Sequence, residues 1–300
     1  MKHPSASRQA LTVTAALAAA VSSNAALACS TCKCGDYTIT LLGSEKAYSG
    51  RFRTAVDYVY RSETAGVDAG EQETTEQRTT LGLAYSLSED ITLALQVPFV
   101  RKEIEAGNLA RQEAEGLGDI DLTARWTLHR SGAVSGRHLA GVRAGVRLPT
   151  SEEVEADGEL LDIDVQPDAG ATVPSLGAWY GYYRFPWFAT ATVTAFKYGE
   201  GNQQFEGGDA MVVSTLAQYG LTQTLALQLG VDARWSGRNR FLGVADPDSG
   251  GTLAMAFAGA ALRMGEDFLV HAGAQLPLIE ELNGEQDEDP ALRVGMTYDF

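Results

Sequence analysis

The chain has 300 residues, enough for one large domain or two of ordinary size. Acidic residues outnumber basic ones, 39 to 23, and the formal net charge of −16 argues against a nucleic-acid partner, because binding phosphates needs a basic surface. The mean hydropathy of −0.11 is too polar for a helical membrane protein and too apolar for a disordered chain. Beyond residue 30, no run reaches the ~18 apolar residues that a membrane-spanning helix needs.

The N-terminus has the pattern of a secretory signal peptide. Lys2 and Arg8 precede an apolar run at 10–21, and Ala26-Leu27-Ala28 supplies an A-x-A cleavage site. We therefore expect residues 1–28 to be removed. Two alternatives are a buried N-terminal helix and a lipoprotein signal, although the leucine lies one position later than in a typical lipobox.

All the cysteines of the chain lie in one short run, Cys29, Cys32 and Cys34. This C-x-x-C-x-C run can form one disulfide, carry a lipid, or bind a soft metal through its thiolates, and the sequence leaves the three alternatives open. We treat 29–47 as a short cysteine-rich periplasmic segment. No cofactor is expected apart from a metal ion at these cysteines.

From residue 48 onward the hydropathy pattern has a period of two. Between 225 and 235, for example, leucine, valine and tryptophan alternate with glutamine, aspartate and arginine. An apolar face opposite a charged face predicts a β-strand. Several of these segments reach about ten residues, longer than the typical five or six, and about nine to eleven are needed for a strand to cross a membrane.

Extending this pattern along the chain predicts about twelve strands. They cover residues 49–61, 77–88, 91–104, 117–129, 138–149, 172–184, 187–198, 209–219, 222–235, 252–263, 267–276 and 291–300. Short links follow every second strand and longer links follow the others. This layout predicts an all-β transmembrane, antiparallel up-and-down β-barrel over residues 48–300.

The last strand ends in alternating apolar residues and Phe300, which resembles the C-terminal assembly signal of bacterial barrels. With the signal peptide, this predicts a Gram-negative outer-membrane location, with the termini in the periplasm and contacts to lipid and lipopolysaccharide. Acidic residues concentrate in three expected extracellular loops, at 63–76, 152–168 and 280–289. They would either attract cations to the entrance or keep the loops solvated.

The polar faces of the predicted strands carry charges of both signs. We expect them to line the lumen, with Arg51, Arg53, Asp57, Asp119, Asp121, Arg125, Arg143, Arg147, Asp232, Arg234, His271 and Arg293 as the candidate selectivity residues. Charges in this position need water or ion pairs. The set predicts either a selectivity lining for a polar or anionic solute, or a charge network that fills a narrow barrel.

Four short motifs resemble one known family. They are Val97-Pro98, the Gly-Leu-Gly-Asp run that begins 116–126, the Gly-Val-Arg-Leu-Pro-Thr of 145–150, and the Gln-Pro-Asp that begins 166–170. They are similar to the outer-membrane transporter family named for the meta-pathway of phenol degradation, over most of 48–300. The resemblance implies a barrel that passes small, often aromatic or apolar, compounds. The chain departs from the family at 149–151 and 166–168, where Pro-x-Gly and Gln-Pro-Gly are usual.

The function predicted from the sequence is therefore an outer-membrane channel or transporter for small molecules. The alternative is a barrel-anchored metal-binding protein, or one that docks a periplasmic partner, acting through Cys29–Cys34. An enzyme is not expected, because neither His129, His138 nor His271 has a serine at a convincing strand spacing for nucleophilic catalysis.

Overall fold

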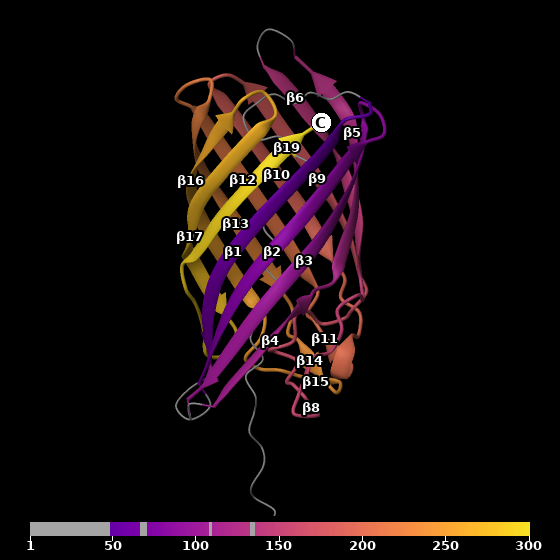
Figure 1. The fold of residues 1–300 in the computed structure, drawn as a ribbon, viewed down its shortest axis with the longest axis vertical. Helices are drawn as coiled ribbons and strands as arrows, with labels where there is room; N and C mark the ends of the chain where they lie inside the picture. The colour runs from indigo at the N-terminus through magenta and orange to yellow at the C-terminus, as the bar shows by residue number, and fades with distance from the viewer. Residues whose placement is uncertain (1–48, 67–70, 108–109, 133–135) are drawn as a thin grey trace, which may run out of the picture.

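A computed structural model describes residues 49–66, 71–107, 110–132 and 136–300. These residues form a closed antiparallel β-barrel (Figure 1). The main sheet has 14 strands, and they fill twelve positions in the wall because β4 shares a position with β5, and β18 with β19. The predicted fold class and strand number are thus confirmed.

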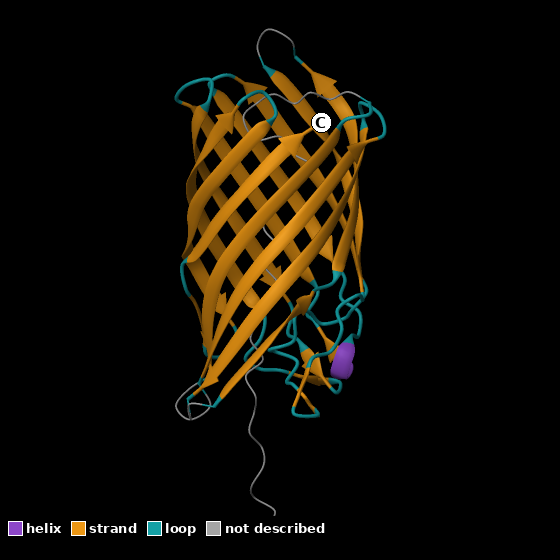
Figure 2. Ribbon diagram, in the orientation of Figure 1, coloured by secondary structure: helices purple, strands orange, loops and turns teal. Residues whose placement is uncertain are grey.

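The wall strands are tilted and long (Figure 2). In order they are β1 (Phe52–Ala65), β2 (Gln72–Ser86), β3 (Ile91–Ala106), β4 (Arg111–Leu117), β5 (Ile120–Ser131), β6 (Arg137–Leu148), β9 (Val173–Arg184), β10 (Trp187–Phe196), β12 (Ala210–Gly220), β13 (Leu225–Ser236), β16 (Gly251–Met264), β17 (Phe268–Leu282), β18 (Gln286–Glu288) and β19 (Ala291–Asp299). The connections hold β7 (Glu155–Ala156), β8 (Glu159–Leu160), the 3-10 helix η2 (Asn202–Gln204), β11 (Phe205–Glu206), β14 (Arg240–Phe241) and β15 (Val244–Ala245).

The first and last wall strands close the barrel. β1 pairs with β2 on one side and with β19 on the other, in a register that runs from Arg53 opposite Asp299 to Tyr60 opposite Leu292. Closure gives the backbone groups of both terminal strands hydrogen-bond partners, as a hydrocarbon environment requires. It also fixes which side chains point inward.

The outward side chains form an apolar belt around the wall. Leu176 and Leu229 are each 65% exposed, and the large aromatic side chains of Trp126 and Trp187 are exposed as well. Exposed apolar surface of this extent and continuity is typical of a wall covered by lipid. The period-two pattern therefore identified the correct face of the strands.

The two ends of the barrel differ. At the upper end in Figure 1, which we call the turn end, strands are joined by short connections and the C-terminus is found. These short connections include 87–90, 185–186, 221–224 and 265–267. At the opposite end, the loop end, lie the long connections 149–172, 197–209, 237–250 and 283–290.

The expected long loop at 63–76 is not a loop. β1 and β2 continue through most of it and leave only residues 66–71 between them. Glu63 and Glu76 lie in these strands, and their side chains are buried on the inner side. The pattern missed this extension because polar residues occupy both faces here, so the contrast in hydropathy ends where the apolar belt ends although strand pairing continues.

The described part of the chain contains no helix long and apolar enough to cross a membrane. The expected signal peptide at 1–28 and cysteine-rich segment at 29–47 lie outside the described residues. Both remain predictions.

The apolar belt predicts how the wall responds to charge. Leu229 lies near the middle of β13 and points outward, so Leu229→Arg should lower the free energy of unfolding in phospholipid vesicles by about 2–4 kcal/mol. Guanidinium unfolding followed by tryptophan fluorescence measures this change. Leu242→Arg, at an exposed loop position, is the control and should change it little. Equal effects at both positions would contradict a lipid-covered wall.

Candidate functional site

The long connection 149–172 folds into the loop end of the barrel and packs against its inner wall. Val165 is fully buried and packs with Ile104 of β3 and Ala114 of β4. Gln166 is 1% exposed, and its side chain bonds to other residues of the same connection. Its Oε1 accepts the N–H of Val154 at 2.7 Å, and its Nε2 donates to the carbonyl of Leu161 at 2.9 Å. The segment is thus a compact loop with its own internal hydrogen bonds.

A β-bulge in the wall receives this loop. β3 pairs with β4 and with β5 in registers that differ by one residue, and the extra residue lies at Gly118-Asp119, opposite Pro98. Pro98 has no N–H to donate, so the ladder is interrupted there, while its carbonyl still accepts the N–H of Gly118 at 2.9 Å. The bulge leaves backbone groups that need other partners.

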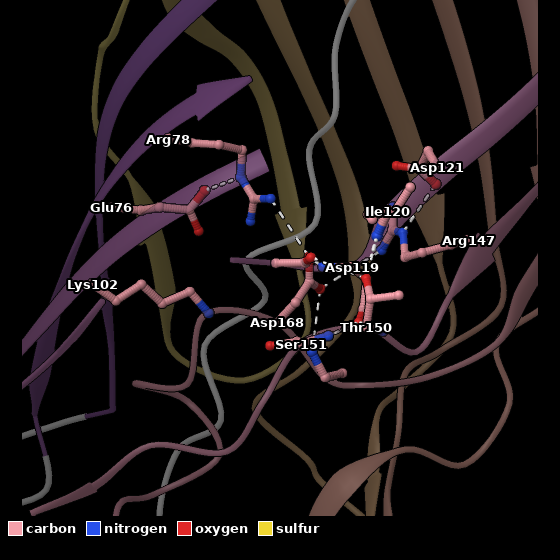
Figure 3. Close-up of polar contacts among 12 residues, drawn as sticks. Glu76, Arg78, Lys102, Asp119, Ile120, Asp121, Arg147, Thr150, Ser151 and Asp168 are labelled. Atoms are coloured by element: carbon pink, nitrogen blue, oxygen red, sulfur yellow. Dashed lines mark hydrogen bonds and ion pairs between the residues drawn. The ribbon is translucent and has the colours of Figure 1, made fainter. Parts of the chain in front are cut away.

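The loop and the bulge satisfy each other's hydrogen bonds (Figure 3). The Asp119 carboxylate accepts the N–H groups of Thr150 and Ser151 at 3.0 Å each, and that of Ala171 at 3.3 Å, so it holds both ends of the loop. In return, the Thr150 hydroxyl accepts the N–H of Ile120 at 2.9 Å and donates to the Gly118 carbonyl.

Asp168 fastens the inner part of the loop. Its carboxylate accepts the N–H of Asp119 at 3.3 Å and lies 3.5 Å from Arg78 Nη1 and 3.9 Å from Arg147 Nη1. Arg78 projects from β2 and Arg147 from β6, so the loop carboxylate lies between cations from two separate wall strands (Figure 3). Glu76 accepts from Arg78 Nε at 2.7 Å, and Asp121 accepts from Arg147 Nε at 3.3 Å.

The four motifs that carry the family resemblance meet at this place. A Cβ at Gly116 would lie 3.2 Å from Pro167, and one at Gly118 would lie 3.1 Å from both Pro98 and Asp168. These contacts would be tight, so the missing side chains at 116 and 118 let the loop approach the wall closely. The motifs describe one structural unit, which we call the loop anchor: Pro98, Gly116–Ile120, Thr150, Ser151 and Gln166–Asp168.

A small cavity of about 40 Å³ lies beside the loop anchor. Among the side chains that line it are Lys102, Asp119, Arg147, Asp164, Asp168, Tyr198 and Arg234. Lys102 Nζ donates to the carbonyl of Asp164 at 3.2 Å. Burial, with the nearby Asp162 carboxylate, holds the pKa of Asp164 well above its usual range. The cavity is thus a polar site with both signs of charge.

A second group of buried carboxyls lies further toward the loop end. Glu288 of β18 is directly opposite Glu63 of β1 and contacts Arg61, whose Nε is 3.6 Å away. Burial raises the pKa of Glu288 to about 8, and Glu63 and Glu76 add to the rise, which Arg61 only partly offsets. Burial and the neighbouring carboxyls therefore favour the protonated form of Glu288.

The candidate lumen residues are inward-facing but do not form one site. Four of them, Asp119, Asp121, Arg147 and Arg234, contribute to the loop anchor or its cavity. In the middle of the barrel, Asp57 accepts from Arg293 Nε and contacts His271 Nε2, both at 3.1 Å. Asp232 accepts from Gln275 at 2.9 Å.

The remaining candidates lie at the turn end or near the middle of β5 and β6. Arg51 and Arg53 form ion pairs with Asp299. The Arg125 guanidinium stacks 4.4 Å from the centre of the Trp179 ring, and Arg143 occupies an inward position on β6.

The sequence did not identify Lys102, Gln166, Asp168 and Asp299 as site residues. Asp299 alternates with the outward apolar residues of the closing strand, so the period-two pattern could have identified it as a lumen residue. Asp168 and Gln166 belong to a loop, where alternation carries no information. The family-like Gln-Pro-Asp motif includes both, and Asp168 also belongs to the acidic stretch 152–168, but neither observation indicated contact with the wall. Nothing in the sequence indicated that Lys102 would reach the loop.

Two histidines considered for catalysis have other partners. His138 Nδ1 is 2.7 Å from the Tyr180 hydroxyl, and His271 contacts Asp57. Within the described ranges, no group of three or more histidine, cysteine, aspartate or glutamate side chains could hold a metal ion. The suggested ligands Cys29, Cys32 and Cys34 lie outside these ranges, so a metal there remains a prediction.

No protein-family model and no curated protein matches the chain. Its structure is similar to an outer membrane channel from Pseudomonas putida F1, with a TM-score of 0.67, 17% identity, and coverage of 84% of this chain and 96% of the other. It is also similar to the translocator domain of the autotransporter NalP from Neisseria meningitidis, with a TM-score of 0.51, 17% identity, and coverage of 86% and 91%. The transport unit of the autotransporter AIDA-I from Escherichia coli gives a TM-score of 0.51 at 9% identity, with coverage of 87% and 93%. The fold is therefore that of an outer-membrane β-barrel.

Removing the Asp119 carboxylate should release the loop. Asp119→Ala leaves three loop N–H groups without their acceptor, and each such group costs about 1–3 kcal/mol when buried. We expect amide hydrogen exchange at 151–171 to rise at least about tenfold while the wall strands keep their protection. Glu159→Ala, at an exposed position in the same loop, is the control. Unchanged exchange in Asp119→Ala would contradict the anchoring role.

The buried proton on Glu288 predicts a pH dependence. The folded protein keeps this proton up to about pH 8, whereas the unfolded chain loses it near 4.5, so stability should fall as pH rises between these values. Glu288→Gln should flatten the fall and be more stable than the native chain at pH 9, by a few kcal/mol as an order of magnitude. Unfolding in urea at pH 4 and pH 9 measures this. Glu266→Gln, exposed at the turn end, should leave the fall intact.

Proposed function

We propose that the protein is an outer-membrane channel for small solutes. The observation that carries the proposal is the loop 149–172, held inside the mouth of the barrel by Asp119 and by Asp168 between Arg78 and Arg147. A loop that only covered the surface would not need fixed bonds to charges on the inner wall. An inward loop bonded to the wall narrows a pore at a defined place, where charged side chains select what passes.

The size and lining of the barrel support the proposal. Twelve strands lie between the eight of a barrel filled by side chains and the sixteen of an open porin. The inner wall carries ionisable groups along its length, from Asp299 at the turn end to Glu288 at the loop end. Such groups need water or paired charges inside a membrane-spanning wall. A charged, partly hydrated lumen favours small solutes that carry a polar group.

The difference between the two ends of the barrel supports an orientation in the membrane. The turn end, with the C-terminus, faces the periplasm, and the loop end faces the outside of the cell. Glu152, Glu153, Glu155 and Glu159 are exposed at the loop end. There they lie at the level of lipopolysaccharide, whose bridging divalent cations they can share.

Reconstitution into planar bilayers tests the channel. The full-length protein should give stepwise conductance, and replacing residues 152–165 by a short Gly-Ser linker should raise the single-channel conductance several-fold, because the loop narrows the mouth. The same replacement at 241–244, in the hairpin of β14 and β15, is the control and should raise it much less. Inserted protein that shows neither conductance nor solute uptake, with or without the loop, would disprove the channel.

A further inference from the structure

The Asp168 carboxylate lies in a position that a bound ligand could take. It sits between the guanidinium groups of Arg78 and Arg147, at 3.5 and 3.9 Å. These distances are longer than the about 2.7–2.9 Å of a charge-assisted hydrogen bond. In addition, the Nη1 atom of Arg78, a side chain that is more than nine-tenths buried, has no hydrogen-bond partner. The loop carboxylate therefore faces both arginines without using all their donors.

The surroundings are closely balanced in charge. Glu76 pairs with Arg78, Asp121 pairs with Arg147, and the Asp119 carboxylate is committed to backbone N–H groups of the loop. Lys102 and Arg234 also line the adjoining cavity, so four cations face the four carboxylates of Glu76, Asp119, Asp121 and Asp168. Burial raises the pKa of the neighbouring Asp164 and favours its neutral form. Removing Asp168 alone would therefore leave one positive charge in excess in a buried place, which is unfavourable. An incoming carboxylate that took its place would restore the balance.

The adjoining cavity suggests what such a ligand would carry. Lys102 and Arg234 also line it, and so do the rings of Tyr198 and Phe205. The Arg147 guanidinium lies 5.9 Å from the centre of the Tyr198 ring. The planar fork of a guanidinium matches a carboxylate in two-point contact, and aromatic rings next to it suit a flat apolar body.

We propose that Arg78 and Arg147 form a binding site for the carboxylate of a transported solute, and that Asp168 is a built-in competitor which occupies this site when the mouth is narrow. The proposal rests on the channel function proposed above and specifies its substrate class as small organic carboxylates with an apolar body. Binding would displace Asp168 from the arginines and loosen the inner part of the loop, so the solute would widen its own path.

Direct binding to the full-length protein in detergent tests this without requiring conductance. Isothermal titration with benzoate should give saturable binding, whereas the similarly shaped benzamide and benzylamine should not bind. Arg78→Gln and Arg147→Gln should weaken benzoate binding at least about tenfold, and Asp168→Asn should tighten it about tenfold because the competing charge is removed. The tighter binding expected for Asp168→Asn is the most decisive of these results, since misfolding does not produce tighter binding.

The controls carry matched changes in charge away from the site. Arg101→Gln removes an outward arginine of β3 that pairs with Glu113, and Glu155→Gln removes an exposed carboxylate of the same loop. Both should bind benzoate like the native protein. Arg78→Lys keeps the charge beside the buried Glu76 and serves if Arg78→Gln fails to fold; it should weaken binding through the lost two-point geometry.

Three results would overturn the carboxylate site. They are equal binding of benzoate and benzamide, unchanged or weaker binding in Asp168→Asn, and equally tight binding of inorganic phosphate with the same dependence on the arginines, which would indicate a general oxyanion site. Benzoate binding as expected in a protein that gives no conductance or uptake would instead overturn the channel and leave the site in place.

Discussion

The structure depends on one constraint, which is that every backbone N–H and carbonyl in contact with hydrocarbon must find a partner within the protein. Closure of β1 on β19 meets this constraint around the wall. Once the strands are paired in a ring, the direction of each side chain is fixed. Along a strand, side chains then alternate between the lipid and the lumen. The apolar belt and the charged interior are two consequences of the same geometry.

The same constraint explains how the interior keeps so many charges. An isolated charge in a membrane-spanning wall is unfavourable. Some of the described lumen charges pair within one strand, as Glu76 and Arg78 do, and others pair across strands that are distant in the sequence. Asp57 of β1 meets Arg293 of β19 and His271 of β17, and Asp299 meets Arg51 and Arg53. These contacts tie the closing strand to the first strand, so the polar interior strengthens the seam of the barrel.

The sequence predicted the wall of the barrel better than its loops. Alternation located the wall strands because parity and lipid contact impose it on each of them. It failed at Glu63 and Glu76, where both faces are polar although the strands continue. It identified Asp119 and Arg147 as lumen residues but gave no indication that they hold a loop, because partners such as Asp168 are set by a fold of 149–172 that has no period.

The bulge at Gly118-Asp119 is the place where the constraint is broken and then satisfied in another way. Pro98 removes one donor from the ladder, and the extra residue in the opposite strand leaves further groups unpaired. In a wall of regular strands, the backbone groups at this position would pair with the neighbouring strand and would need no hydrogen bonds from a loop. Here Thr150 and Asp168 supply the missing partners, and the bulge turns the Asp119 carboxylate toward the loop backbone. The irregular strand thus determines where the loop sits, and the loop brings a carboxylate to two arginines that an unobstructed barrel would leave facing the solute.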